Sequence, residues 1–140
     1  MALLDILPDR RPEGGDTMAM ITPPTEAQEQ RDLFRWAAFN RGRYPELDLM
    51  HHIPNGGSRN TLEAHNLKQQ GVKAGVPDIC LPVARGPYHG LYIELKRVRN
   101  GKLSNDQRRW LGDLTKQGYR AVMCRGWEEA RKEIEAYLNI

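Results

Sequence analysis

The sequence has few cysteines and lacks long apolar runs. Cys80 and Cys124 are its two cysteines, and neither a CxxC nor an HxxxH spacing occurs. A disulfide framework and a zinc site are therefore not expected, and both thiols should be reduced. No apolar run approaches the ~20 residues of a membrane span, and the chain does not begin with the basic residues of a signal peptide. We expect a cytoplasmic protein rather than a secreted or membrane-spanning one.

Charge of one sign is also scarce over the chain as a whole. The 140 residues carry a formal net charge of +3, which by itself does not indicate a polyanionic partner. The positive charge is nevertheless local, because residues 85–109 contain seven Lys or Arg but two Asp or Glu, a local excess of five. Such a stretch is either a solvated face or a surface that contacts phosphates. The charge pattern alone leaves both interpretations open.

The length of the chain suits one domain with its own core. Residues 1–24 contain four prolines and no sustained apolar period, so we interpret them as a loosely ordered arm. Folding signals begin at Thr25, which has Gln28 three residues later in the spacing of a capping box. We therefore place the domain at residues 25–140.

Apolar periodicity within this domain predicts alternating helices and strands. The expected elements are a helix over 25–41, a short strand within 47–53, a polar helix over 60–70, an antiparallel hairpin of 79–84 and 91–98, a helix over 104–118, a strand over 119–124 and a helix over 127–138. This order predicts an α/β fold with a mixed central sheet flanked by helices.

The predicted hairpin carries two acids and a lysine. A turn centred near residues 86–87 would pair Asp78 with residues 95–96, and strand alternation puts Glu94 and Lys96 on one face. Two carboxylates can hold a hard divalent ion such as Mg²⁺, and a neighbouring lysine can orient or deprotonate the water that attacks a phosphodiester. The alternative is an exposed cross-strand Glu–Lys pair, with Asp78 as a turn residue.

Four segments resemble a known family when they are taken in chain order. They are HIPNGGSR at 52–59, GVPDI at 75–79, YIELKR at 92–97 and LSNDQRRWL at 103–111. Together they resemble the VRR-NUC branch of the PD-(D/E)xK nuclease superfamily, in particular its small stand-alone phage-type members. The resemblance covers about residues 25–125 and implies a restriction-endonuclease-like core. It also implies a protein that works in a bacterium or in a phage-infected cell.

The resemblance implies a metal site on the hairpin. Asp78, Glu94 and the carbonyl of Leu95 would hold Mg²⁺ or Mn²⁺, and Lys96 would be the catalytic lysine. The family also uses a glutamate on its first helix. We assign it to Glu26, because Glu26 shares a stripe with Gln30, Leu33 and Ala37 that should face the sheet, with Glu29 as the fallback. Acidic residues in a first turn also complement the helix dipole without any metal.

Further residues are candidates for catalysis or for DNA contact, and of these Gln107 matches the family pattern. Gln107 could reach the site, although a capping box with Ser104 explains it equally well. Asn55 and Arg59 either contact a DNA phosphate or support the site, because a Gly-rich loop brings backbone close to a ligand. The alternative is a turn that needs Asn-Gly geometry. The expected DNA contacts of the basic stretch are Arg97, Arg99, Lys102 and Arg108.

These residues predict a metal-dependent DNA endonuclease. By resemblance it would cleave branched DNA such as Holliday junctions, act as a homodimer and leave 5′-phosphate ends. Two-fold symmetry suits that task, because a domain with one active site needs a partner to cut both strands. A non-catalytic DNA-binding accessory module that uses the same basic surface is the alternative. Cleavage of RNA is a third possibility, because this chemistry does not read the 2′-hydroxyl.

Overall fold

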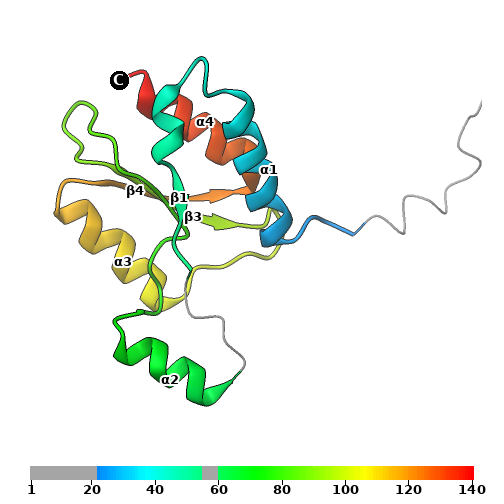
Figure 1. Cartoon of the computed structure of the whole chain (residues 1–140), viewed down its shortest axis with the longest axis vertical. Helices are drawn as coiled ribbons and strands as arrows, with labels where there is room; N and C mark the ends of the chain where they lie inside the picture. Colours follow the sequence, from blue (N-terminus) through cyan, green and yellow to red (C-terminus); the bar gives the residue numbers. More distant parts are fainter. Residues whose placement is uncertain (1–21, 55–59) are drawn as a thin grey trace, which may run out of the picture.

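A four-stranded sheet with helices on both faces forms the body of the protein (Figure 1). The structure, a computed structural model, describes residues 22–54 and 60–140. Its elements are α1 (Glu26–Phe39), the short 3₁₀ helix η3 (Pro45–Leu49), β1 (His51–His52), α2 (Thr61–Gln69), β2 (Ile79–Leu81), β3 (Leu91–Lys96), α3 (Asn105–Lys116), β4 (Arg120–Arg125) and α4 (Gly126–Leu138). The predicted mixed sheet flanked by helices is confirmed.

Local capping fixes where two of the helices begin. The Thr25 hydroxyl accepts a hydrogen bond from the Gln28 N–H, and the Gln28 side chain accepts one from the Thr25 N–H. Ser104 and Gln107 form the same reciprocal pair at the start of α3. Each box satisfies two amides that a helix start otherwise leaves without a partner. Both predicted capping boxes are confirmed.

The strand predicted within residues 47–53 is mostly wrong. Residues 45–49 form η3, and the strand that follows contains only His51 and His52. Pro45 stands at the start of η3, where its fixed φ and missing N–H are compatible with a helical turn. Leu47 is buried while Leu49 is exposed, so these leucines do not line one face of a strand.

The sheet order β1-β2-β3-β4 combines antiparallel and parallel pairs. β1 and β3 both run antiparallel to β2, and β4 runs parallel to β3. In the β2–β3 hairpin, Leu81 pairs with Leu91, while the outer bridge joins Arg85 to Tyr88. Residues 82–84 therefore stand against residues 89–90, so the first arm carries one extra residue, as in a β-bulge. This extra residue changes the register from the one predicted.

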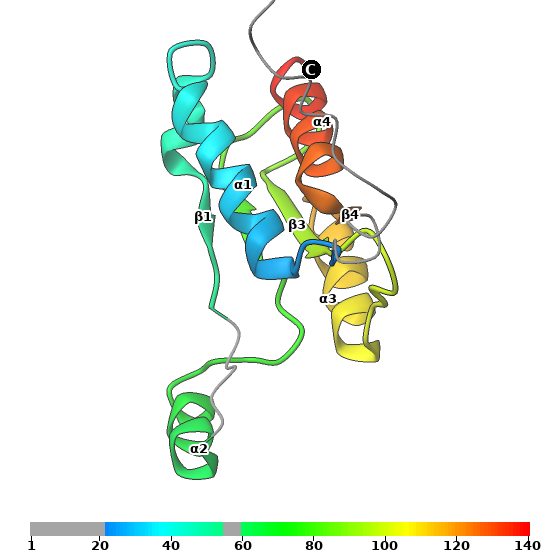
Figure 2. The same ribbon diagram turned by 90° about the vertical axis from the view of Figure 1, so that its right-hand side faces the viewer.

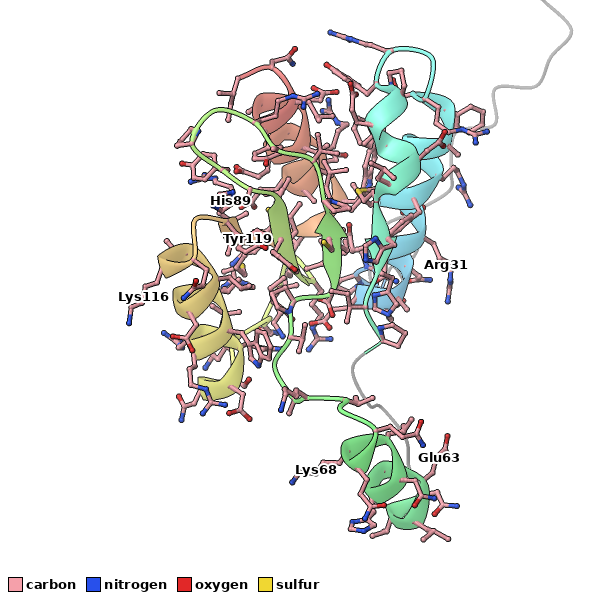
Figure 3. All side chains as sticks on the ribbon, turned by 60° about the vertical axis from the view of Figure 1, so that its left-hand side comes forward. Arg31, Glu63, Lys68, His89, Lys116 and Tyr119 are labelled. Atoms are coloured by element: carbon pink, nitrogen blue, oxygen red, sulfur yellow. The ribbon has the colours of Figure 1, made fainter. Side chains whose placement is uncertain are left out.

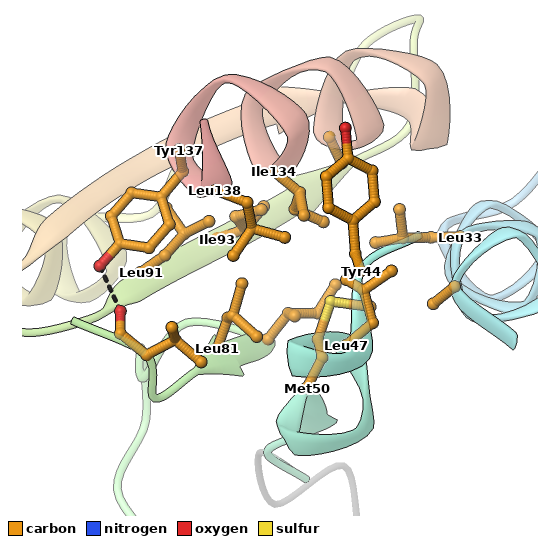
Figure 4. Close-up of a cluster of buried hydrophobic side chains, with 14 of the residues drawn as sticks. Leu33, Tyr44, Leu47, Met50, Leu81, Leu91, Ile93, Ile134, Tyr137 and Leu138 are labelled. Atoms are coloured by element: carbon orange, nitrogen blue, oxygen red, sulfur yellow. Dashed lines mark hydrogen bonds between the residues drawn. The ribbon is translucent and has the colours of Figure 1, made fainter. Parts of the chain in front are cut away.

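The core lies between the sheet and the pair of helices α1 and α4. Figure 4 shows Leu91 and Ile93 of β3 beneath Ile134 and Tyr137 of α4, and all four are at most 2% exposed. The Tyr137 hydroxyl donates to the Val83 carbonyl, which satisfies a buried polar group. Burying each such side chain contributes about 1.5–3 kcal/mol, so this face of the sheet is where the fold gains most of its stability.

Helix α3 covers the other face, and α2 stands apart from the body. Side chains on β3 alternate, so Tyr92, Glu94 and Lys96 point away from the α1–α4 core toward the α3 side. Figure 2 shows α2 below the sheet, and no residue of this helix is buried within the described structure. Glu63 and Lys68 of α2 lie well away from the strands in Figure 3. None of the helices described is both long and apolar enough to cross a membrane.

Both cysteines are buried free thiols, as predicted. Cys80 pairs with Tyr92 and Cys124 pairs with Leu95, so the two side chains belong to opposite faces of the sheet. Burial raises the pKa of the Cys124 thiol to about 12 and also raises that of Cys80. Neither thiol is a reactive nucleophile in this state.

Candidate active site

Two carboxylates meet where β2 begins and β3 approaches its end. Extending the observed register by one residue places Asp78 opposite Glu94, not opposite residues 95–96 as predicted. The two side chains therefore share a face of the sheet. The Asp78 Oδ2 accepts a hydrogen bond of 3.0 Å from the Leu95 N–H. In an extended strand the N–H and C=O of one residue point to the same edge, so the Leu95 carbonyl is also directed toward Asp78.

Glu94 is a buried acid, and one of its oxygens has no hydrogen-bond partner within residues 22–54 and 60–140. Its side chain is 2% exposed, and Oε2 makes no hydrogen bond to any described residue. Burial and, to a smaller extent, the neighbouring Asp78 carboxylate raise the pKa of Glu94 to about 8, although Lys96 acts in the opposite direction. A buried polar atom without a partner costs free energy, and a cation at this position would remove that cost. The site therefore favours either a proton or a positive ion.

Lys96 lies among the carboxylates. Its Nζ is 3.7 Å from Glu94 Oε1 and 3.9 Å from Glu26 Oε1, and the residue is 8% exposed. The loop after β3 folds back onto the end of that strand. Gly101 lies so close to Lys96 that a Cβ at position 101 would be 2.9 Å from the Lys96 Cβ. The Arg125 guanidinium fixes this loop by donating to the Gly101 carbonyl at 2.6 Å. The packing of this loop therefore restricts the Lys96 side chain to positions beside Glu94 and Glu26.

Gln107 connects the start of α3 to this cluster. Its Nε2 donates to Glu94 Oε1 at 2.9 Å, while its Oε1 accepts from the Ser104 N–H. The sequence left open whether Gln107 belongs to the site or to the capping box. In the structure it does both, because its Nε2 contacts Glu94 and its Oε1 contacts Ser104. Because the Oε1 is committed to the cap, the amide is oriented with its donor toward Glu94.

Of the two candidate glutamates on α1, Glu26 lies beside the cluster. The predicted stripe is wrong, since Glu29, not Glu26, is buried in line with Leu33 and Ala37. The Glu29 Oε2 accepts a hydrogen bond of 2.7 Å from the Trp127 N–H at the start of α4. Glu29 thus caps a helix, whereas the half-exposed Glu26 reaches Lys96.

The basic stretch divides into separate parts in the structure. Arg85 lies on the β2–β3 loop, where it pairs with Glu46 at 3.2 Å, and it does not join the cluster. The four residues of this stretch that were expected at DNA are all exposed, and none of them forms an ion pair with a described carboxylate: Arg97, Arg99, Lys102 and Arg108. They lie on the loop after β3 and on α3, which flank Lys96 and Gln107. Asn55 and Arg59 lie outside the described residues.

The donor set fits a hard divalent ion. Within residues 22–54 and 60–140, no three His, Cys, Asp or Glu side chains gather closely enough to hold a metal ion by themselves. The Asp78 and Glu94 carboxylates and the Leu95 carbonyl nevertheless offer oxygen ligands where β2 begins and β3 ends. Mg²⁺ is usually held by one or two carboxylates together with water. The observation in this structure that supports the fit is the Glu94 Oε2, which has no hydrogen-bond partner in the part of the chain that the structure describes.

Two features of the site and its surroundings were not predicted. The first is Gly101, whose missing side chain lets the loop after β3 pack on Lys96; the Asn-Gly pair at 100–101 is its signal in the sequence. A groove of about 730 Å³ also runs between α2 and α3, lined by Leu67, Val72, Trp110 and Leu114 among others. None of the carboxylates of the cluster, Glu26, Asp78 and Glu94, lines this groove.

The structure is a mixed sheet whose hairpin presents Asp78, Glu94 and Lys96 on one face, as expected for a protein of the nuclease type. The family model for the VRR-NUC domain matches residues 24–128, and the chain belongs to this family. A solved structure described as a VRR_NUC domain protein is 34% identical, with a TM-score of 0.73, and the match covers 85% of this chain and 92% of that one. No curated protein matches the sequence.

Proposed function

We propose that the protein is a Mg²⁺- or Mn²⁺-dependent DNA endonuclease that cleaves branched DNA, such as Holliday junctions, as a homodimer. Membership of the VRR-NUC family supports a nuclease-type function in general. The unpartnered oxygen of the buried Glu94, next to Asp78 and Lys96, is the observation that carries the metal-dependent part of this proposal. The remaining parts rest on the family resemblance and on the exposed basic residues around the cluster.

Each residue of the cluster has a proposed role. Asp78, Glu94 and the Leu95 carbonyl hold the divalent ion, and Glu26 is the acid that we assign to the site from α1. When bound, such an ion supplies positive charge against the phosphate oxygens and makes a water molecule more acidic. Lys96 orients the attacking water as an ammonium group or, as the neutral amine, takes its proton. The Glu94 and Glu26 carboxylates, 3.7 and 3.9 Å from its Nζ, keep this group at the site.

Gln107 and the exposed basic residues act around the reacting phosphate. Gln107 keeps the Glu94 carboxylate in one orientation through its 2.9 Å hydrogen bond. The exposed cations contact phosphates on either side of the cleaved bond, which positions the strand without reading its sequence. These DNA contacts are Arg97, Arg99, Lys102 and Arg108.

Cleavage of a substrate panel tests this proposal. The panel comprises a four-way junction, a flap, a linear duplex and a single strand, each incubated with Mg²⁺, Mn²⁺ or EDTA. We expect metal-dependent cleavage that is fastest on the branched substrates, and loss of cleavage in Asp78→Asn. Binding of all substrates without any cleavage in either metal would instead identify a non-catalytic DNA-binding module.

A further inference from the structure

Two neighbouring histidines on β1 use the same ring atom in the same way. The His51 Nδ1 lies 2.9 Å from the Leu49 carbonyl, and the His52 Nδ1 lies 2.8 Å from the Asp78 carbonyl. A carbonyl oxygen only accepts hydrogen bonds, so each Nδ1 carries the hydrogen. Both histidines are exposed. The two histidines therefore differ mainly in which carbonyl they bind.

The carbonyl that His52 binds belongs to a proposed metal ligand. The same Asp78 oxygen also accepts a hydrogen bond of 2.7 Å from the Ile53 N–H, so both of its lone pairs are used. The Asp78 carboxylate is held from the other strand by the Leu95 N–H at 3.0 Å. Asp78 stands just before β2 begins, so the backbone hydrogen bonds between β2 and β3 do not hold its main chain in place.

We propose that His52 is a positioning residue for Asp78. Its Nδ1–H and the Ile53 N–H hold the main-chain carbonyl of Asp78, and this fixes the direction in which the carboxylate leaves the backbone. β1 contains two residues at the edge of the sheet, so this side-chain bond is a substantial part of what ties it to the start of β2. The inference depends on the proposed function only in taking Asp78 as a metal ligand.

Three substitutions at position 52 separate the role of Nδ1 from the mere presence of a histidine. In His52→Asn the side-chain amide nitrogen takes the place of Nδ1, whereas in His52→Gln the amide reaches the position of Nε2, and His52→Ala has no donor. His51→Ala is the matched control, because it removes the same bond from a carbonyl outside the site. Thermal melting of all four variants checks that the fold is retained.

Hydrogen exchange of the Leu95 amide, measured by NMR in metal-free protein, reports whether Asp78 remains in place. One hydrogen bond contributes roughly 0.5–1.5 kcal/mol, equivalent to a factor of about two to ten in an equilibrium. We therefore expect Leu95 to exchange about two- to tenfold faster in His52→Ala and His52→Gln, with His52→Asn and His51→Ala close to wild type. Calorimetric titration of Mn²⁺ should show weaker binding in the same two variants.

Two results would overturn the positioning role. One is unchanged Leu95 exchange in His52→Ala and His52→Gln, and the other is an equal increase in His51→Ala. If the wild-type protein binds no Mn²⁺, the proposed function fails, but the exchange rates still decide whether His52 positions Asp78. If His52→Ala does not fold, the comparison of His52→Asn with His52→Gln gives the same answer.

Discussion

Replacing Glu94 by glutamine should stabilise the metal-free protein at alkaline pH. Burial and the Asp78 carboxylate raise the pKa of Glu94 from 4.5 to about 8. As the pH rises through 4.5 the unfolded chain loses this proton first, so the wild-type protein loses stability between about pH 4.5 and 8. At 1.36 kcal/mol per pKa unit the full loss is on the order of 3–5 kcal/mol, and Glu94→Gln, which never ionises, does not incur it.

Urea unfolding in EDTA at a series of pH values measures this effect. We expect the two proteins to be similarly stable near pH 4.5, and the variant to be increasingly more stable up to about pH 8, where the difference becomes constant. Adding Mn²⁺ at pH 8 should stabilise the wild-type protein and not Glu94→Gln, because a bound cation favours the ionised acid. A variant less stable than wild type at pH 8 in EDTA would refute the account of Glu94.

Three further predictions concern residues around the cluster and the assembly. Glu29→Ala leaves the Trp127 amide without its partner and should lower the free energy of unfolding by about 1–3 kcal/mol, whereas Glu29→Gln, which keeps an acceptor, should lower it less; urea titration measures both. Gln107→Glu places a second negative charge 2.9 Å from Glu94 and should weaken or abolish cleavage at neutral pH, whereas unchanged kcat would contradict the role of Gln107. Light scattering at micromolar protein should give the mass of a dimer, and a monomer would refute the proposed assembly.

Much of the fold followed from local rules. The Thr25 and Ser104 capping boxes begin their helices where the spacing predicted, and strand alternation placed Glu94 and Lys96 on one face. These features depend on residues three or fewer apart, so the sequence alone contains them. The Pro45 segment was misjudged because leucines at alternate positions resemble a strand even where a proline starts a 3₁₀ turn.

The parts of the site that escaped prediction depend on residues far apart in the chain. The register of the hairpin depends on one extra residue among 82–84, which turn signals did not reveal. The choice between Glu26 and Glu29 depends on Trp127, about a hundred residues away, because its backbone N–H donates a hydrogen bond to the Glu29 carboxylate. Only the assembled fold shows that Glu94 keeps an oxygen without a partner among the described residues.

The most direct test of the central claim is single-turnover cleavage of a labelled four-way junction in Mn²⁺ by Lys96→Ala and Lys116→Ala. Lys96 is held between Glu94 and Glu26, whereas Lys116 is exposed at the last residue of α3 (Figure 3), at the other end of this helix from Gln107. We expect wild-type rates from Lys116→Ala and a loss of at least about 100-fold from Lys96→Ala, the usual contribution of a positioned acid or base. Equal cleavage by the two variants would contradict the assignment of the active site to this hairpin.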